Sequence, residues 1–273
     1  MRPKVGSREL SRELMSPIEL VVARHRERLE WTRRVPRSLR VSVYDTGAGL
    51  VPVTLPHAAI VPLPDVGRED HSYLTHLVQR YDTLAPLTVF CQGHPFDHAH
   101  DLHRVLRALD SGAVRVEAFH WLGFIIDSDD ARGRRLFVPW SKNRDRRELE
   151  LDRFHRELFG EAAPEWVRFY PGAQFAVTAA CVRTRPRSFY ERALALSESF
   201  PDAGHCFERL WDRVFGVAAV DPAVLGGEMC RYLKPIRRLA DAAAGGAPAQ
   251  RTAPSASPDD PPAAAPRRRV IRN

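Results

Sequence analysis

A run rich in histidine and aspartate, His94-Pro-Phe-Asp-His-Ala-His-Asp-Leu-His103, is the strongest chemical feature of the sequence. Four of the eleven histidines fall within these ten residues. Histidine and aspartate are common ligands of Mn, Zn and Fe, and His94, Asp97 and His98 could share one turn. Histidine is also the usual acid or base near neutral pH. The run therefore predicts a catalytic or binding site; the alternative is that Asp97 caps a helix whose other histidines are solvated.

Basic residues in two further segments suit an anionic ligand. Arg24 follows a predicted strand, and its planar guanidinium can donate two hydrogen bonds to a phosphate. Gly67 permits a tight loop, and Arg68 and Glu69 lead into a predicted helix whose N-terminal amides favour an anion. His71 lies in the first turn of that helix. Acidic residues that complement a helix dipole are the alternative reading, but they do not account for the arginine and the histidine.

A third group stands downstream, in a predicted helix around Glu208 and Arg209. If Glu208 faces inward, burial raises its pKa and makes it a candidate general base. The alternative is a Glu–Arg surface pair on an amphipathic helix. We also assign His205 and Arg209 on this helix, and Gln174 at a predicted strand entry, to substrate binding.

The run Asp127-Ser-Asp-Asp130 matches, superficially, the Asp-x-Asp motif of metal-dependent sugar transferases. The residues that follow it, Ala-Arg-Gly-Arg-Arg, are typical of a hairpin or surface turn. We prefer the turn, because any Asp-x-Asp is a weak motif.

Alternating strands and helices must position these residues. Short apolar, β-branched runs predict strands at 18–23, 40–44, 87–91 and 175–178. Apolar residues at helical spacing predict helices at 27–35, 70–81, 101–109, 186–199 and 203–215. The alternation indicates an α/β fold with a mostly parallel sheet flanked by helices. Ligands bind at the carboxyl ends of such strands, which selects the residues after Ala23, Tyr44 and Cys91.

Composition divides the 273 residues into three segments. Residues 1–16 are polar and are expected to be a flexible leader, and 17–240 to form one α/β domain. Residues 241–273 are rich in Ala, Pro and Arg, with too little large apolar surface to offset the entropy of ordering, so we expect a disordered tail.

No apolar run approaches the roughly 20 residues that span a bilayer, and the N-terminus lacks the apolar core of a signal peptide. The four cysteines lie far apart and form no Cys-x-x-Cys pair, which is typical of reduced thiols. We therefore expect a cytoplasmic protein. The net charge of +7 is concentrated partly in the tail, so we expect an anionic small molecule as partner and no nucleic acid. The sequence does not determine the oligomeric state.

Several motifs, in order, resemble a bacterial and fungal family catalogued as domain of unknown function number three-four-three-one. They are Glu19-Leu-Val-Val-Ala-Arg24, Val66-Gly-Arg-Glu69, Gln92-Gly-His-Pro-Phe-Asp-His98, Gly172-Ala-Gln-Phe-Ala-Val177 and Phe207-Glu-Arg-Leu-Trp211. The resemblance covers about residues 18–216 and implies no biochemistry by itself.

At a second level, the order of these motifs is similar to that of glycosyltransferases with the GT-A fold, a Rossmann-related α/β domain. That resemblance implies that Arg24, Gly67 and Arg68 face a nucleotide. It also implies that the loop from Gln92 through Gly93 to His98 stands where those enzymes carry Asp-x-Asp and a divalent metal. Glu208 would correspond to the acidic base.

The function expected from this resemblance is transfer of a sugar from a nucleotide sugar to an acceptor, possible cofactors being Mn or Mg. His98 and its loop would assist the leaving group, and Glu208 or Asp97 would deprotonate the acceptor. Two alternatives stay open. One is a metal-dependent oxygenase or hydrolase with His94, Asp97 and His98 as ligands, and the other is a non-catalytic module that binds a sugar or nucleotide.

Overall fold

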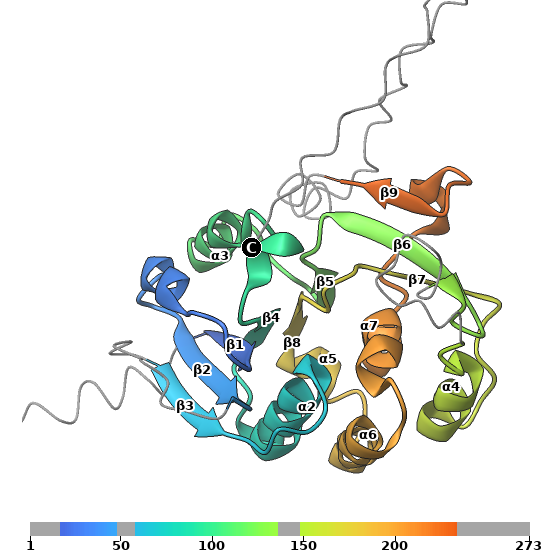
Figure 1. The fold of residues 1–273 in the computed structure, drawn as a ribbon. Coiled ribbons are helices and arrows are strands. Elements are labelled where there is room, and N and C mark those ends of the chain that lie inside the picture. The colour runs from blue at the N-terminus through green and yellow to red at the C-terminus, as the bar shows by residue number, and fades with distance from the viewer. Residues whose placement is uncertain (1–16, 48–57, 136–147, 234–273) are drawn as a thin grey trace, which may run out of the picture.

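The computed structural model describes residues 17–47, 58–135 and 148–233 (Figure 1). The predicted leader at 1–16 and tail at 241–273 lie outside these ranges. The described chain forms a six-stranded sheet in the order β3-β2-β1-β4-β8-β5 and a three-stranded sheet in the order β7-β6-β9. Helices flank the large sheet, so the predicted α/β class with a mostly parallel sheet is confirmed.

The large sheet is parallel at one side and antiparallel at the other. Its strands are β1 (Ile18–Arg24), β2 (Arg40–Asp45), β3 (Ala58–Pro62), β4 (Leu87–Gln92), β5 (Phe119–Trp121) and β8 (Phe175–Thr178). β1 pairs in parallel with β2 and β4, and β2 pairs in parallel with β3. β8 runs antiparallel to both β4 and β5.

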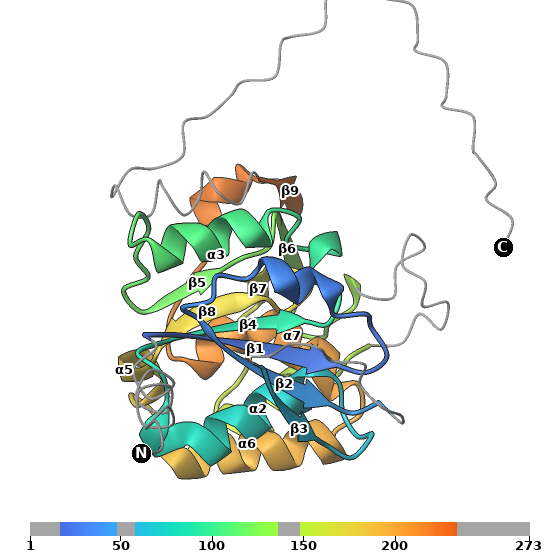
Figure 2. The same ribbon diagram turned by 90° about the vertical axis from the view of Figure 1, so that its left-hand side faces the viewer.

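Two apolar clusters cover the faces of β1, and this explains its nearly continuous apolar sequence. Leu20 and Val22 pack on one face with α3 (Leu102–Asp110) and the segment of the 3-10 helix η1 (Glu30–Arg34). Val21 packs on the other face with α2 (Glu69–Arg80), α4 (Leu151–Phe159), α6 (Arg187–Ser199) and α7 (Ala203–Val214). Figure 2 shows α3 above the sheet and α2 and α6 below it.

Short elements complete the described chain. They are the helix α5 (Ala179–Val182) and the 3-10 turns η2 (Tyr81–Thr83), η3 (Pro95–Asp97) and η5 (Pro222–Leu225). The small sheet consists of β6 (Ile125–Asp130), β7 (Trp166–Phe169) and β9 (Cys230–Tyr232), all antiparallel. No helix in the described ranges is both long and apolar enough to cross a membrane.

Two local predictions were wrong. The helix expected over 27–35 is reduced to the single 3-10 turn η1. The run from Asp127 to Asp130 is the end of strand β6 and not a turn, and the turn begins only at Ala131. The four cysteines are free thiols, as predicted, and Cys91 is completely buried.

Candidate functional site

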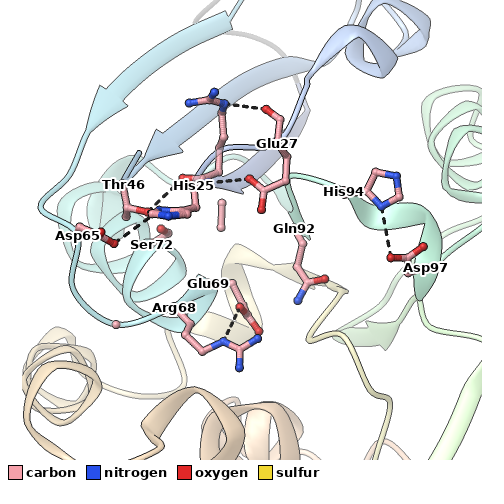
Figure 3. Close-up of a pocket in the computed structure, with 13 residues that line it drawn as sticks. His25, Glu27, Thr46, Asp65, Arg68, Glu69, Ser72, Gln92, His94 and Asp97 are labelled. Atoms are coloured by element: carbon pink, nitrogen blue, oxygen red, sulfur yellow. Dashed lines mark hydrogen bonds and ion pairs between the residues drawn. The ribbon is translucent and has the colours of Figure 1, made fainter. Parts of the chain in front are cut away.

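A cleft of about 480 Å³ opens at the carboxyl ends of β1, β2 and β4 (Figure 3). The chain runs from β1 outward through β2 to β3 and then returns to β4 on the opposite side of β1. The strand order therefore switches direction between β1 and β4, and open α/β sheets bind ligands in the crevice at such a point. The volume lies within the range of small-molecule sites.

Seven of the residues selected from the sequence line this cleft: Arg24, Gly67, Arg68, Glu69, Gln92, His94 and Asp97. The other lining residues are Ala23, His25, Glu27, Thr46, Asp65 and Ser72. His25 and Glu27 follow β1 and Thr46 follows β2, so the carboxyl-end rule applied to every polar residue after these strands would have found them.

The end of β1 forms a wall whose charges are largely matched within the protein. Arg24 Nη1 lies 2.6 Å from Asp45 Oδ1, and its Nε donates to the Glu27 carbonyl at 2.9 Å. Only 11% of the Arg24 side chain is exposed, so this arginine forms part of the wall and its charge is compensated by Asp45. Glu27 in turn accepts the amide of His25 at 2.7 Å.

Gly93 lets β4 approach this wall closely. A Cβ at this position would lie 2.6 Å from Glu27 Oε2 and 3.0 Å from its Cβ. The Gly93 carbonyl also accepts the indole N–H of Trp31 at 2.8 Å. Gly93 thus contributes to the site through the close approach of its backbone.

His25 stands at a second wall, between the ends of β1 and β2. Its Nδ1 lies 3.3 Å from Thr46 Oγ1 and 3.6 Å from Asp65 Oδ1 (Figure 3). Three segments that are distant in sequence therefore hold one imidazole at the cleft.

The loop before α2 forms the facing wall. Gly67 has a φ of +64°, and a Cβ there would lie 2.6 Å from the Cβ of His71, so this position requires glycine. Arg68 is 54% exposed, with Nε 3.6 Å from Glu69 Oε2 and Nη1 3.1 Å from His205 Nε2. Arg68 is therefore a cation at the cleft that is held from two sides.

The His94–Asp97 pair stands at the far side of the cleft, beside Gln92 (Figure 3). His94 Nδ1 lies 3.4 Å from Asp97 Oδ2, and the two side chains are 57% and 76% exposed. His98 instead packs on Gly172, where a Cβ would lie 2.3 Å from the His98 Cγ. Across the described ranges, no three His, Cys, Asp or Glu side chains gather in a way that could hold a metal ion. The predicted trio is thus not assembled as a metal centre.

Two other selected residues point elsewhere. His71 is buried with its Nε2 3.0 Å from Glu198 Oε1, toward α6. Gln174 is completely buried and donates to the Pro95 carbonyl at 2.9 Å. Gln174 therefore stabilises the turn η3, which carries Asp97, through a buried hydrogen bond.

Glu208 is an ionised carboxylate that is surrounded by polar and charged partners. Its Oε1 accepts the amide of Gly172 at 2.6 Å, and its Oε2 lies 4.0 Å from His205 Nδ1 and 3.5 Å from Arg209 Nη1. Burial by itself raises its pKa, but His205, Arg209 and the Gly172 amide lower the pKa to about 2. The expectation of a raised pKa for Glu208 was wrong, because these partners outweigh the effect of burial.

Arg209 belongs to the core. Its Nε lies 2.8 Å from Asp129 Oδ2, and the two side chains are 3% and 0% exposed. The neighbouring aspartates are paired as well, Asp127 with Arg135 at 2.9 Å and Asp130 with Arg134 at 2.7 Å. The Asp-x-Asp run thus forms ion pairs that join β6 to its surroundings.

Comparison with known proteins places the chain in a family. The model of the family described as "Protein of unknown function (DUF3431)" matches residues 20–230. The chain belongs to this family. No curated protein matches it. The match includes every residue that lines the cleft, from Ala23 to Asp97, so the cleft lies within the family domain.

Proposed function

We propose that this protein is a glycosyltransferase-like enzyme that transfers a sugar from a nucleoside diphosphate sugar to an acceptor hydroxyl. The observation that carries the proposal is the cleft at the switch point between β1 and β4, with Arg68 and the start of α2 on one wall. Guanidinium groups and helix N-termini are the standard partners of phosphate oxygens.

The mixed lining of the cleft favours a nucleotide sugar over a simple phosphate. Arg68 and His25 offer hydrogen-bond donors for a diphosphate. Glu27 and Glu69 are acceptors, which suit sugar hydroxyls and repel a bare anion. A ligand that combines an anionic diphosphate with two polyols satisfies both kinds of group.

The reaction assigns different tasks to these residues. The acceptor oxygen bonds to the anomeric carbon, the bond from that carbon to the diphosphate oxygen breaks, and the diphosphate leaves with the electron pair. Arg68 stabilises the charge that grows on the diphosphate. Asp97, oriented by His94 at 3.4 Å, takes the proton of the acceptor hydroxyl. Asp97 is preferred to Glu208 because Asp97 lines the cleft, whereas a carboxylate with a pKa of about 2 is a weak base.

A thermal-shift screen with UDP, GDP, ADP and CDP, each with and without Mn or Mg, tests the binding half. At least one of them is expected to raise the melting temperature of the wild type, and Arg68→Ala to reduce that shift strongly. Arg104→Ala, at an exposed position on α3, is the matched control and should retain it. If no diphosphate stabilises the protein under any condition, the proposal is wrong.

The catalytic half is tested by release of the nucleoside diphosphate from the corresponding nucleotide sugars. The donor that matches the best-binding diphosphate is expected to be consumed slowly with water as acceptor and faster with the correct acceptor. Binding without any release, in the presence of sugar and lipid-linked acceptors, would favour the non-catalytic binding module.

A further inference from the structure

The guanidinium of Arg68 contacts the first turn of α7, through His205, which lies 137 residues away in sequence. Nη1 lies 3.1 Å from His205 Nε2. Because a guanidinium only donates hydrogen bonds, His205 Nε2 has to be the acceptor in this contact. The neutral imidazole then carries its proton on Nδ1, on the side of Glu208 Oε2, 4.0 Å away.

Glu208 and its neighbour hold this histidine in place. The Glu208 carboxylate is anchored by the Gly172 amide at 2.6 Å. Arg209 Nη1 donates to the carbonyl of His205 at 2.9 Å, while its Nε is bound to the buried Asp129. The backbone of His205 is therefore bound to the core, and its ring lies beside an anchored carboxylate at 4.0 Å.

The packing at Gly204 indicates that the Arg68 side chain lies directly on α7. A Cβ on Gly204 would lie 2.9 Å from Arg68 Cδ and 3.2 Å from Arg68 Cβ. Any side chain at position 204 would therefore displace the Arg68 side chain from its observed conformation. Among the described residues, Arg68 Nη2 has no protein acceptor, so this nitrogen can meet a ligand.

We propose that His205, kept in the Nδ1-protonated form by Glu208, is a positioning residue that fixes the Arg68 guanidinium for the diphosphate of the ligand. This inference rests on the proposed function for the identity of the ligand, whereas the arrangement itself exists without ligand. It assigns Glu208 an orienting role in place of the general-base role expected from the sequence.

The arrangement is tested first in the ligand-free protein. The ¹⁵N resonances of the histidine side chains are recorded at pH 8, and His205 is identified as the signal missing in His205→Gln. The expected pattern is the Nδ1–H tautomer, with a changed Nε2 shift in Arg68→Ala. An Nε2–H tautomer, or an Nε2 shift unaffected by Arg68→Ala, would overturn the inference whatever the protein binds.

The second test measures binding of inorganic pyrophosphate and UDP by calorimetry. Arg68→Ala is expected to weaken binding roughly 10- to 100-fold, the range of a charged hydrogen bond. His205→Phe and Gly204→Ala should weaken it about 3- to 10-fold, while His205→Gln, which keeps an acceptor, stays within about twofold of the wild type. Unfolding midpoints measured in parallel separate these losses from simple destabilisation.

The two proposals fail in different ways. If Arg68→Ala binds both probes as the wild type does, the phosphate site of the proposed function is wrong, and the NMR result still decides the role of His205. If Arg68→Ala loses binding but His205→Phe and Gly204→Ala do not, the positioning role is wrong and the proposed function stands.

Discussion

Arg209 Nε lies 2.8 Å from Asp129 Oδ2, and this ion pair joins α7 to β6 across a distance of 80 residues in sequence. Both side chains are buried, and the Arg209 guanidinium also lies 4.7 Å from the centre of the Phe169 ring. The pair connects the small sheet to the helix that carries His205. Loss of this ion pair should therefore lower the stability of the domain more than it changes ligand binding.

Asp129→Asn is expected to lower the free energy of unfolding by about 3 kcal/mol, because it removes the closer countercharge of the buried guanidinium and leaves only Glu208, at 3.5 Å. Urea unfolding monitored by tryptophan fluorescence measures this change. The double variant Asp129→Leu with Arg209→Met should recover most of the loss, since it removes both charges together. A single variant as stable as the wild type would contradict the structural role of the pair.

A second prediction concerns His76, which is completely buried against Glu19 and Tyr44. Burial lowers the pKa of His76 from 6.5 to about 4, so the folded protein keeps this imidazole neutral where the unfolded chain would protonate it. The stability that depends on the neutral form is complete above pH 6.5 and is lost as the pH falls toward 4. The loss is on the order of 3 kcal/mol.

Urea unfolding from pH 8 to pH 4 checks this prediction. His76→Gln keeps an acceptor for the Tyr44 hydroxyl but cannot be protonated, so its stability should fall less over this range. His100→Gln, at an exposed position, should follow the wild type. Identical slopes for wild type and His76→Gln would contradict the prediction.

A third prediction concerns Asp70, which has the opposite pH dependence. Asp70 is 1% exposed, and only Oδ1 has a partner among the described residues, the Arg68 amide at 3.2 Å. Burial, assisted by the charge of Glu69, raises the pKa of Asp70 from 3.8 to about 7. The contribution of protonated Asp70 to the free energy of unfolding is complete below pH 3.8 and is lost as the pH rises through 7. The total loss is on the order of 4 kcal/mol.

Asp70→Asn removes this titration while retaining the acceptor for the Arg68 amide. The difference in unfolding free energy, wild type minus variant, should therefore decrease between pH 4 and pH 8. A constant difference across that range would mean that Asp70 is solvated more than its burial indicates.

A fourth prediction concerns Asp97 and follows from the proposed function. Asp97→Asn is expected to reduce turnover of the nucleotide sugar roughly 10²- to 10⁴-fold, the usual contribution of a general base, with binding of the diphosphate retained. His94→Gln should cause a smaller loss. Asp82→Asn is the matched control, since Asp82 is 80% exposed and lies outside the cleft lining. Full activity of Asp97→Asn would transfer the role of base to another carboxylate.

Much of the sheet was visible in the sequence. β1, β2 and β4 are mostly apolar runs because strands buried on both faces favour apolar side chains on both faces, and this pattern is local. The predicted bounds of these strands agree with the structure to within one residue. The carboxyl ends of β1 and β4, and with them Arg24, Gln92 and the loop to Asp97, followed directly.

The short strands and the polar strand could not be predicted from the sequence. β5 and β9 have three residues each, which is too few for a period to be recognised. β6 ends in Asp-Ser-Asp-Asp, a composition that predicts a turn. Its burial becomes favourable only through Arg135 and Arg209, so no pattern within β6 itself could have indicated the strand.

The amino-acid sequence by itself determined three of the four parallel strands, β1, β2 and β4, and the loops that meet at their carboxyl edge, but it did not indicate β3. The tertiary structure decided the direction in which each side chain points and the charge that it meets there. His98 packs on Gly172, and Glu208 becomes more acidic where burial alone would make it less so. The physical reason is that periodicity reports local burial, whereas a pKa and an ion pair depend on partners that lie many residues away in the chain.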